Sequence, residues 1–121
     1  NCRKIRCNKN EWKLNFHETV KVILIDSSEN IIFEGDWKGK MPNGIGIHNE
    51  QTFSYKGEFK DGYRHGKGYL LSNNQTYFYQ GDWEEDKQNG QGEEIIKDVL
   101  SYKVNFLNGE KNGVGAIALS N

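Results

Sequence analysis

Four segments of the chain alternate aromatic and glycine residues with polar ones, and each predicts a β-strand. In each segment an aromatic residue is followed two positions later by glycine and four positions later by a second aromatic residue, except that Val104 replaces the glycine of the fourth segment. Side chains two residues apart lie on the same face of a strand, so both rings should share one face. The ring pairs are Phe33 and Trp37, Tyr55 and Phe59, Tyr79 and Trp83, and Tyr102 and Phe106.

A Gly-x-Gly pair follows each segment, eleven and thirteen residues after its leading ring, as Gly66 and Gly68 follow Tyr55. The five or six residues before the pair, such as 61–65, are predicted to form a turn, and the glycines are predicted to open a return strand. Glycine within a strand often marks the close approach of another group. We therefore predict that the glycine pairs form slots that the neighbouring rings fill.

Polar, turn-prone links at 49–51, 72–75 and 97–98 separate the units. Each unit is therefore predicted to be a hairpin, with repeats that start at residues 33, 55, 79 and 102. A lone hairpin is marginally stable in water. We expect the hairpins to pair edge to edge, because a stack of repeats buries one continuous face.

The N-terminal region lacks glycine slots but keeps the alternation. The spacing predicts strands at 12–16 and 20–26, which would make residues 12–32 a degenerate hairpin that caps the array. We expect residues 1–11 to be a basic N-terminal extension and residues 12–121 to form the repeat array.

The repeated pattern resembles that of MORN (membrane occupation and recognition nexus) repeats across about residues 33 to 119. Residues 61–68, Asp-Gly-Tyr-Arg-His-Gly-Lys-Gly, are nearest the family pattern. Lys40 and Asp86 replace the glycine found at Gly62 and Gly109, so we expect those two turns to be shaped differently. The resemblance implies an all-β fold, an elongated, twisted, single-layer antiparallel sheet of stacked hairpins with a grooved face.

The composition argues against a nucleic-acid-binding protein, a membrane-spanning helix and a disulfide-stabilised domain. The chain has 16 basic and 17 acidic residues and a net charge of −1, whereas a nucleic-acid-binding protein is expected to have a basic face. No apolar run reaches the length of a transmembrane helix. Cys2 and Cys7 lie too close together for a disulfide scaffold. The cysteine content favours an intracellular protein, and the resemblance implies the cytoplasm, cytoskeleton or cilium as its setting.

The ring stripe is the candidate partner site. One interpretation makes it core, and the other leaves part of it open as a groove, because a single-layer sheet has no second layer to cover its rings. A helical or extended segment of a partner protein would suit such a groove. The candidate residues are Phe33, Trp37, Tyr55, Phe59, Tyr79, Trp83, Tyr102 and Phe106.

A basic cluster near the N-terminus is a candidate site for acidic phospholipid. It comprises Arg3, Lys4, Arg6, Lys9 and Lys13. The alternative is a solvated extension without a ligand.

Catalytic, cofactor and metal sites are not predicted. The histidines lie in no nucleophile motif, and Cys2 and Cys7 lack the spacing and the partners of a zinc site. Gly62 and Gly66 are one residue too close for a phosphate-binding loop. The sequence thus favours a non-catalytic protein-binding scaffold, and the resemblance implies a cytoskeletal, ciliary or membrane-associated assembly. The alternatives are a phospholipid-binding module and an accessory array of a lipid kinase or methyltransferase, which the resemblance allows.

Overall fold

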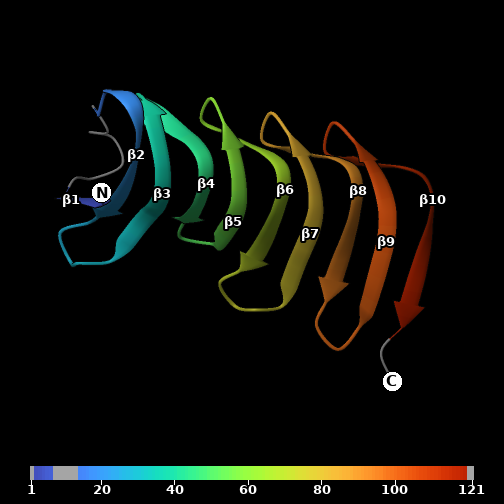
Figure 1. Ribbon diagram of the computed structural model, residues 1–121. Coiled ribbons are helices and arrows are strands. Elements are labelled where there is room, and N and C mark those ends of the chain that lie inside the picture. The colour runs from blue at the N-terminus through green and yellow to red at the C-terminus, as the bar shows by residue number, and fades with distance from the viewer. Residues whose placement is uncertain (1, 7–13, 120–121) are drawn as a thin grey trace.

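A computed structural model describes residues 2–6 and 14–119, and all regular structure in this part of the chain is β-strand. Ten strands form one open sheet in which sequence neighbours are also spatial neighbours (Figure 1). The strands are β1 (Cys2–Arg6), β2 (Phe16–Ile25), β3 (Ile31–Gly39), β4 (Met41–Asn49), β5 (Phe53–Lys60), β6 (Tyr63–Ser72), β7 (Tyr77–Glu84), β8 (Lys87–Ile96), β9 (Leu100–Leu107) and β10 (Glu110–Leu119). The predicted all-β, single-layer, antiparallel array of hairpins is confirmed.

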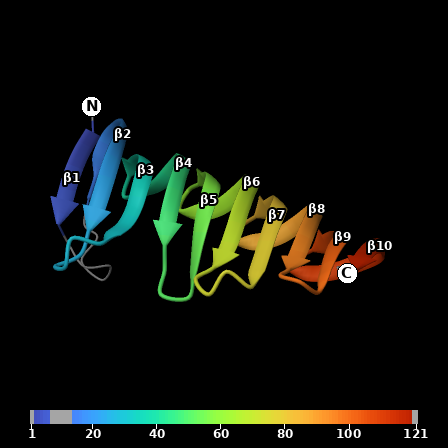
Figure 2. The same ribbon diagram turned by 90° about the horizontal axis from the view of Figure 1, so that it is seen from below.

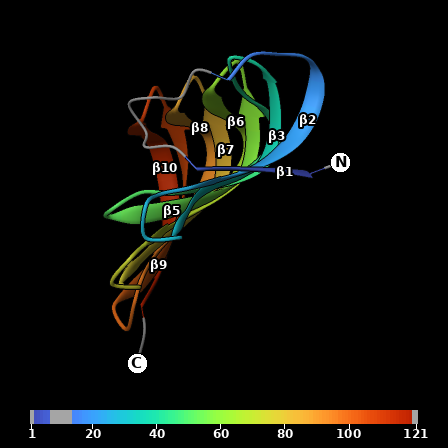
Figure 3. The same cartoon turned by 90° about the vertical axis from the view of Figure 1, so that its left-hand side faces the viewer.

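The array is elongated, and Figure 2 shows the strands following one another from one end to the other. Viewed from its N-terminal end, the sheet is bent into an arch (Figure 3). Each hairpin pairs antiparallel with the next through the return strand of one unit and the first strand of the following unit. Edge-to-edge stacking of the hairpins is therefore confirmed.

The turns within the hairpins are shorter than the predicted five or six residues. Lys60 pairs with Tyr63, so only Asp61 and Gly62 form the loop, and the return strand begins at Tyr63 and not at Gly66. Both loop residues have positive φ, 51° and 85°. This is the signature of a type I′ turn, whose twist matches that of the flanking strands.

One of the two turns predicted to be shaped differently follows the common pattern. Asp86 takes a φ of 70° and Glu85 one of 47°, close to the values at their equivalents in the next repeat. Aspartate tolerates the left-handed region better than most residues. The turn between β3 and β4 does differ, since Gly39 has a φ of 63° and Lys40 has no positive φ.

A bulge in each of the first three return strands explains the first glycine of each pair. One residue of β3, Asp36, lies between the Gly35–Gly46 and Trp37–Pro42 pairs, against three residues of β4, 43–45. Gly44 lies in this bulge with a φ of 121°. The Asp36 carboxylate accepts the N–H of Ile45 at 2.9 Å. Glu58 and Asp82 accept the equivalent N–H groups of the next two repeats, at 2.7 and 3.2 Å.

The N-terminal end differs from its prediction. Residues 16–25 form one strand, β2, and Leu14 and Asn15 lie outside any strand, so the expected antiparallel pair 12–16 with 20–26 is wrong. Cys2–Arg6, predicted as part of an extension, forms β1 and pairs parallel with Lys21–Ile25 of β2. This short edge strand pairs with backbone N–H and C=O groups of β2 that could otherwise form hydrogen bonds with another chain.

Candidate functional site on the ring face

The ring face is the face of the sheet that carries the predicted aromatic stripe, and most of the stripe is core. Seven of the eight rings are between 0 and 7% exposed. Tyr102 is half-buried and packs against the cluster that the others form. The interpretation of the stripe as core is the one that this burial supports. The rings offer a partner little surface, and their direct role in binding stays a prediction.

The buried rings contact one another edge to face in an unbroken series along the array. Phe33 meets Trp37 and Phe59 with ring centroids 5.6 Å apart in both pairs. Tyr55 then meets Phe59 at 5.1 Å and Trp83 at 5.4 Å. Tyr79 continues to Trp83 at 5.3 Å and Phe106 at 5.4 Å. This geometry adds about 1 kcal/mol per pair to the burial of the rings, so the series ties the four repeats together.

In the first three repeats the predicted glycine slots exist at the second glycine of the pair, whereas the surroundings of the fourth pair, Gly113 and Gly115, fall outside the described side chains. A Cβ at Gly68 would lie 2.2 Å from the Tyr55 hydroxyl oxygen, and one at Gly92 would lie 2.3 Å from that of Tyr79. At the first glycine of the pair, the nearest atoms belong to a carboxylate and not to a ring, as with Glu58 beside Gly66. In these three repeats the slot prediction is therefore confirmed for the second glycine of the pair and wrong for the first.

The buried tyrosine hydroxyls have structural partners. Tyr55 donates to the Glu58 carbonyl at 2.9 Å, and Tyr79 donates to the Asp82 carbonyl at 3.0 Å. Burial raises the pKa of Tyr79 to about 12 and raises that of Tyr55 as well. Both hydroxyls therefore stay protonated at neutral pH and act as hydrogen-bond donors.

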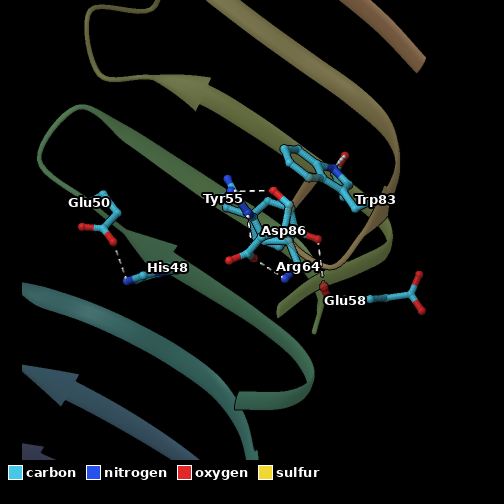
Figure 4. A network of polar contacts seen from close by, with 8 residues as sticks. His48, Glu50, Tyr55, Glu58, Arg64, Trp83 and Asp86 are labelled. Atoms are coloured by element: carbon cyan, nitrogen blue, oxygen red, sulfur yellow. Dashed lines mark hydrogen bonds and ion pairs between the residues drawn. The ribbon is translucent and has the colours of Figure 1, made fainter. Parts of the chain in front are cut away.

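Arg64 covers the rings at the junction between the second and third repeats (Figure 4). Its guanidinium carbon lies 4.6 Å from the centroid of Trp83 and 5.6 Å from that of Phe53. Arg64 Nε donates to Asp86 Oδ1 at 3.3 Å and Nη2 donates to the Asp86 carbonyl at 2.9 Å. The backbone N–H of Arg64 also donates to that carboxylate, at 2.7 Å. Because Asp86 belongs to the turn of the next repeat, these contacts join two neighbouring hairpins.

A second polar cluster lies between the third and fourth repeats. The Glu94 carboxylate accepts a short hydrogen bond from the Tyr77 hydroxyl and pairs with Lys111 at 2.9 Å. Gln88 donates to the Tyr77 oxygen at 3.4 Å. The Lys111 ammonium also lies 5.6 Å from the Tyr102 ring centroid. The Glu94 side chain is 12% exposed and that of Lys111 is 51% exposed, so the two charges on this part of the face neutralise each other.

The partly exposed surface beside the rings was not predicted residue by residue. Leu70 pairs across the sheet with Tyr55 and Tyr79, and Phe53 precedes Tyr55 by two positions, so both lie on the ring face. Leu70, Phe53 and Tyr77 are half-buried and pack against the core cluster. Period-two alternation could have placed them on this face, but it could not have shown that they stay partly exposed while the rings do not.

The opposite face also carries apolar residues. Leu71 pairs with Phe78, and Phe78 pairs with Ile95, in one row across β6, β7 and β8. Tyr69 and Leu71 are 50 and 39% exposed, and the rings of Tyr69 and Phe78 lie 6.0 Å apart. This row provides an internal comparison for any binding test on the ring face.

The other predicted features are placed as follows. Arg3, Lys4 and Arg6 lie in β1, whereas Lys9 and Lys13 fall outside the described residues. Among the described residues, no three His, Cys, Asp or Glu side chains are grouped as metal ligands. The same part of the chain contains no helix with the length and apolar character of a membrane span.

Comparison with known proteins agrees with the repeat geometry. The family model described as MORN repeat matches residues 33–48, 55–77 and 79–98. These stretches start at the leading rings of the first three repeats, whereas the fourth, with Val104 in place of the strand glycine, lies outside them. Comparison with curated proteins gives no match. MORN repeats form modules often involved in membrane or protein association. On its repeat pattern, its stacked hairpins and this match, the chain belongs to the MORN repeat family.

Proposed function

We propose that this chain is a non-catalytic scaffold that holds a segment of a partner protein on its ring face. The observation that carries the proposal is the half-buried apolar surface of Phe53, Leu70 and Tyr77 over the central strands β5, β6 and β7. Apolar surface of this kind, rimmed by polar groups, is typical of protein interaction sites. The rings beneath it make a rigid floor, so a partner would bind a preorganised surface.

The polar groups on both faces of the sheet favour binding over catalysis. The carboxylates Asp36, Glu58 and Asp82 accept backbone N–H groups in the bulges. Asp86 is bonded to Arg64, and Glu94 to Tyr77 and Lys111. General acid–base chemistry needs a group that can exchange a proton with a substrate, and these groups are engaged within the protein. The setting that we propose, an assembly of the cytoskeleton, cilium or membrane, rests on the family alone.

Two adjacent leucines provide a matched test. Peptides would be selected from a displayed random library on the whole chain, and their affinities measured for the Leu70→Asp and Leu71→Asp variants. The two residues lie next to each other in β6 on opposite faces of the sheet. We expect Leu70→Asp to weaken binding by tenfold or more, about 1.4 kcal/mol, and Leu71→Asp to leave it near that of the original chain.

If Leu71→Asp weakened peptide binding more than Leu70→Asp, the interface would lie on the opposite face of the sheet. A library that yields no ligand would contradict a peptide-binding scaffold. Circular dichroism would verify that both variants keep the β-sheet.

A further inference from the structure

The face opposite the ring face carries a group of apolar side chains at the middle of the array. We call this group the central patch, and its members are Tyr69 and Leu71 of β6, Phe78 of β7 and Ile95 of β8. Tyr69 and Leu71 are exposed, and the other two side chains are half-buried. Exposed apolar side chains that are grouped in this way mark an interaction site.

Two charges of opposite sign flank the central patch. One row of cross-strand pairs runs from β5 to β8, and its members are Lys56, Tyr69, Gln80 and Glu93. Lys56 is exposed, and Glu93 is half-buried. Glu93 accepts hydrogen bonds from the uncharged side chains of Ser101 and Gln80, at 2.6 and 3.4 Å. Among the described side chains, neither Lys56 nor Glu93 takes part in an ion pair, so each can meet a charge from another molecule.

A two-fold axis parallel to the strands, midway between β6 and β7, would bring these two charges together between two copies of the chain. Such an axis exchanges β6 with β7 and β5 with β8, and it keeps each row of side chains at its own height. Lys56 of one copy then faces Glu93 of the other, and Leu71 faces Phe78. Every contact occurs twice, as in any isologous dimer. Two sheets that pack face to face with nearly aligned strands are a common arrangement.

The charges favour this axis over the neighbouring axis along β7. An axis along β7 would place Lys56 of one copy against Lys103 of the other, because Lys103 occupies the same row in β9. It would also place Asp82 of the two copies against each other. Like charges directly opposite one another are destabilising. The like charges that the axis between β6 and β7 brings toward each other, Lys60 and Lys87, lie outside the patch beside the hairpin turns.

We propose that the occupant of the central patch is a second copy of this chain, in an isologous dimer whose two-fold axis runs between β6 and β7. Lys56 and Glu93 form reciprocal ion pairs between the copies, and Leu71 packs on Phe78 between those pairs. The ring face stays free in this dimer. The proposal is therefore independent of the proposed function, and each copy can hold its own partner segment.

The size of the patch sets the strength of the contact. With its flanking charges it spans four strands and two rows of side chains, about 19 by 14 Å at the usual spacings. This footprint is well below the area of about 800 Å² that each partner buries in a stable complex. We therefore expect a reversible dimer with a dissociation constant between about 10 μM and 1 mM.

A charge-reversal experiment tests the axis, with self-association of the whole chain measured by sedimentation equilibrium across this concentration range. Lys56→Glu and Glu93→Lys should each weaken the dimer about tenfold or more, because each sets like charges against one another at two places. The double variant Lys56→Glu/Glu93→Lys should restore the dimer. Within one copy the two residues are three strands apart, about 14 Å. Restoration can therefore come only from contact between copies.

Three control variants accompany the charge reversals. Leu71→Asp should abolish self-association, whereas Leu70→Asp should leave it unchanged, because Leu70 lies on the ring face. Lys97→Glu should also leave it unchanged, because Lys97 lies in the loop between β8 and β9, outside the patch. Circular dichroism would verify that every variant keeps the β-sheet.

A chain that stays monomeric across the concentration range would overturn the proposal. A dimer that Lys56→Glu leaves unchanged, or a double variant that does not regain self-association, would also overturn it. A tighter dimer in Lys56→Glu would place the axis along β7 and contradict the one proposed. None of these results bears on peptide binding to the ring face, which the Leu70→Asp measurement tests separately.

Discussion

Gly68 is the position where the role of the glycine slots can be measured directly, by substitution with alanine. Gly68 has a negative φ, so alanine meets no backbone penalty there. The added methyl carbon would lie 2.2 Å from the hydroxyl oxygen of Tyr55 and 2.4 Å from its Cε1 atom. Tyr55 is 1% exposed and is held edge to face by Phe59 and Trp83. The ring therefore cannot move without disturbing both neighbours.

The cost of Gly68→Ala has two parts. Overpacking of a core costs about 1 to 3 kcal/mol, and the hydrogen bond from Tyr55 to the Glu58 carbonyl contributes about 1 kcal/mol. We expect a loss of about 3 kcal/mol in the free energy of unfolding, measured by urea denaturation. Gly39→Ala is the control, because no atom lies within 4 Å of its added carbon. Its φ of 63° should cost about 1 kcal/mol.

A double-mutant cycle isolates the contact with the ring. In a Tyr55→Leu background the clash is absent, so Gly68→Ala should cost less than about 1 kcal/mol. The slot explanation is refuted if Gly68→Ala costs no more than Gly39→Ala, or if its cost is the same in both backgrounds.

Three further predictions concern the polar contacts. Asp36→Asn should destabilise the fold by about 2 kcal/mol at pH 7, the usual contribution of a hydrogen bond to a charged group. Burial by itself would raise the pKa of the Asp36 carboxyl. The hydrogen bonds from Lys21 and Ile45 and the charge of Lys21 outweigh this effect, so the pKa lies below its ordinary value of 3.8. Its stabilisation is present above the unfolded pKa of 3.8 and is lost as the pH falls below it. Urea midpoints should therefore differ between original and variant at pH 7 and converge near pH 2. Arg64→Met should cost about 1 to 2 kcal/mol in thermal unfolding, because it removes the cation from Trp83 and the hydrogen bonds to the next turn. A change of less than about 0.3 kcal/mol would contradict a stabilising role for these contacts. The pKa of Tyr79 is raised to about 12 by burial, so stability should be intact below pH 10 and fall between pH 10 and 12, with tyrosinate absorbance rising in the same interval as the β-sheet signal is lost.

The repeat boundaries, the ring face and the slot at the second glycine of a pair could be predicted from the sequence, because each depends on contacts within one unit. Phe33, Tyr55 and Tyr79 are leading rings that pack over a glycine of their own hairpin. Alternation with period two and a fixed distance between ring and glycine are enough to specify such contacts.

Contacts between units could not be read in the same way. Arg64 and Asp86 are 22 residues apart and belong to different repeats. The parallel pairing of β1 with β2 leaves no period in the sequence. The exposure of the stripe also depends on the bend of the sheet and on side chains from neighbouring hairpins. The sequence therefore determined the repeating unit and its packing face. Only the tertiary structure decided that most of the rings are buried beneath neighbouring side chains and do not line an open groove, because burial results from how adjacent units meet.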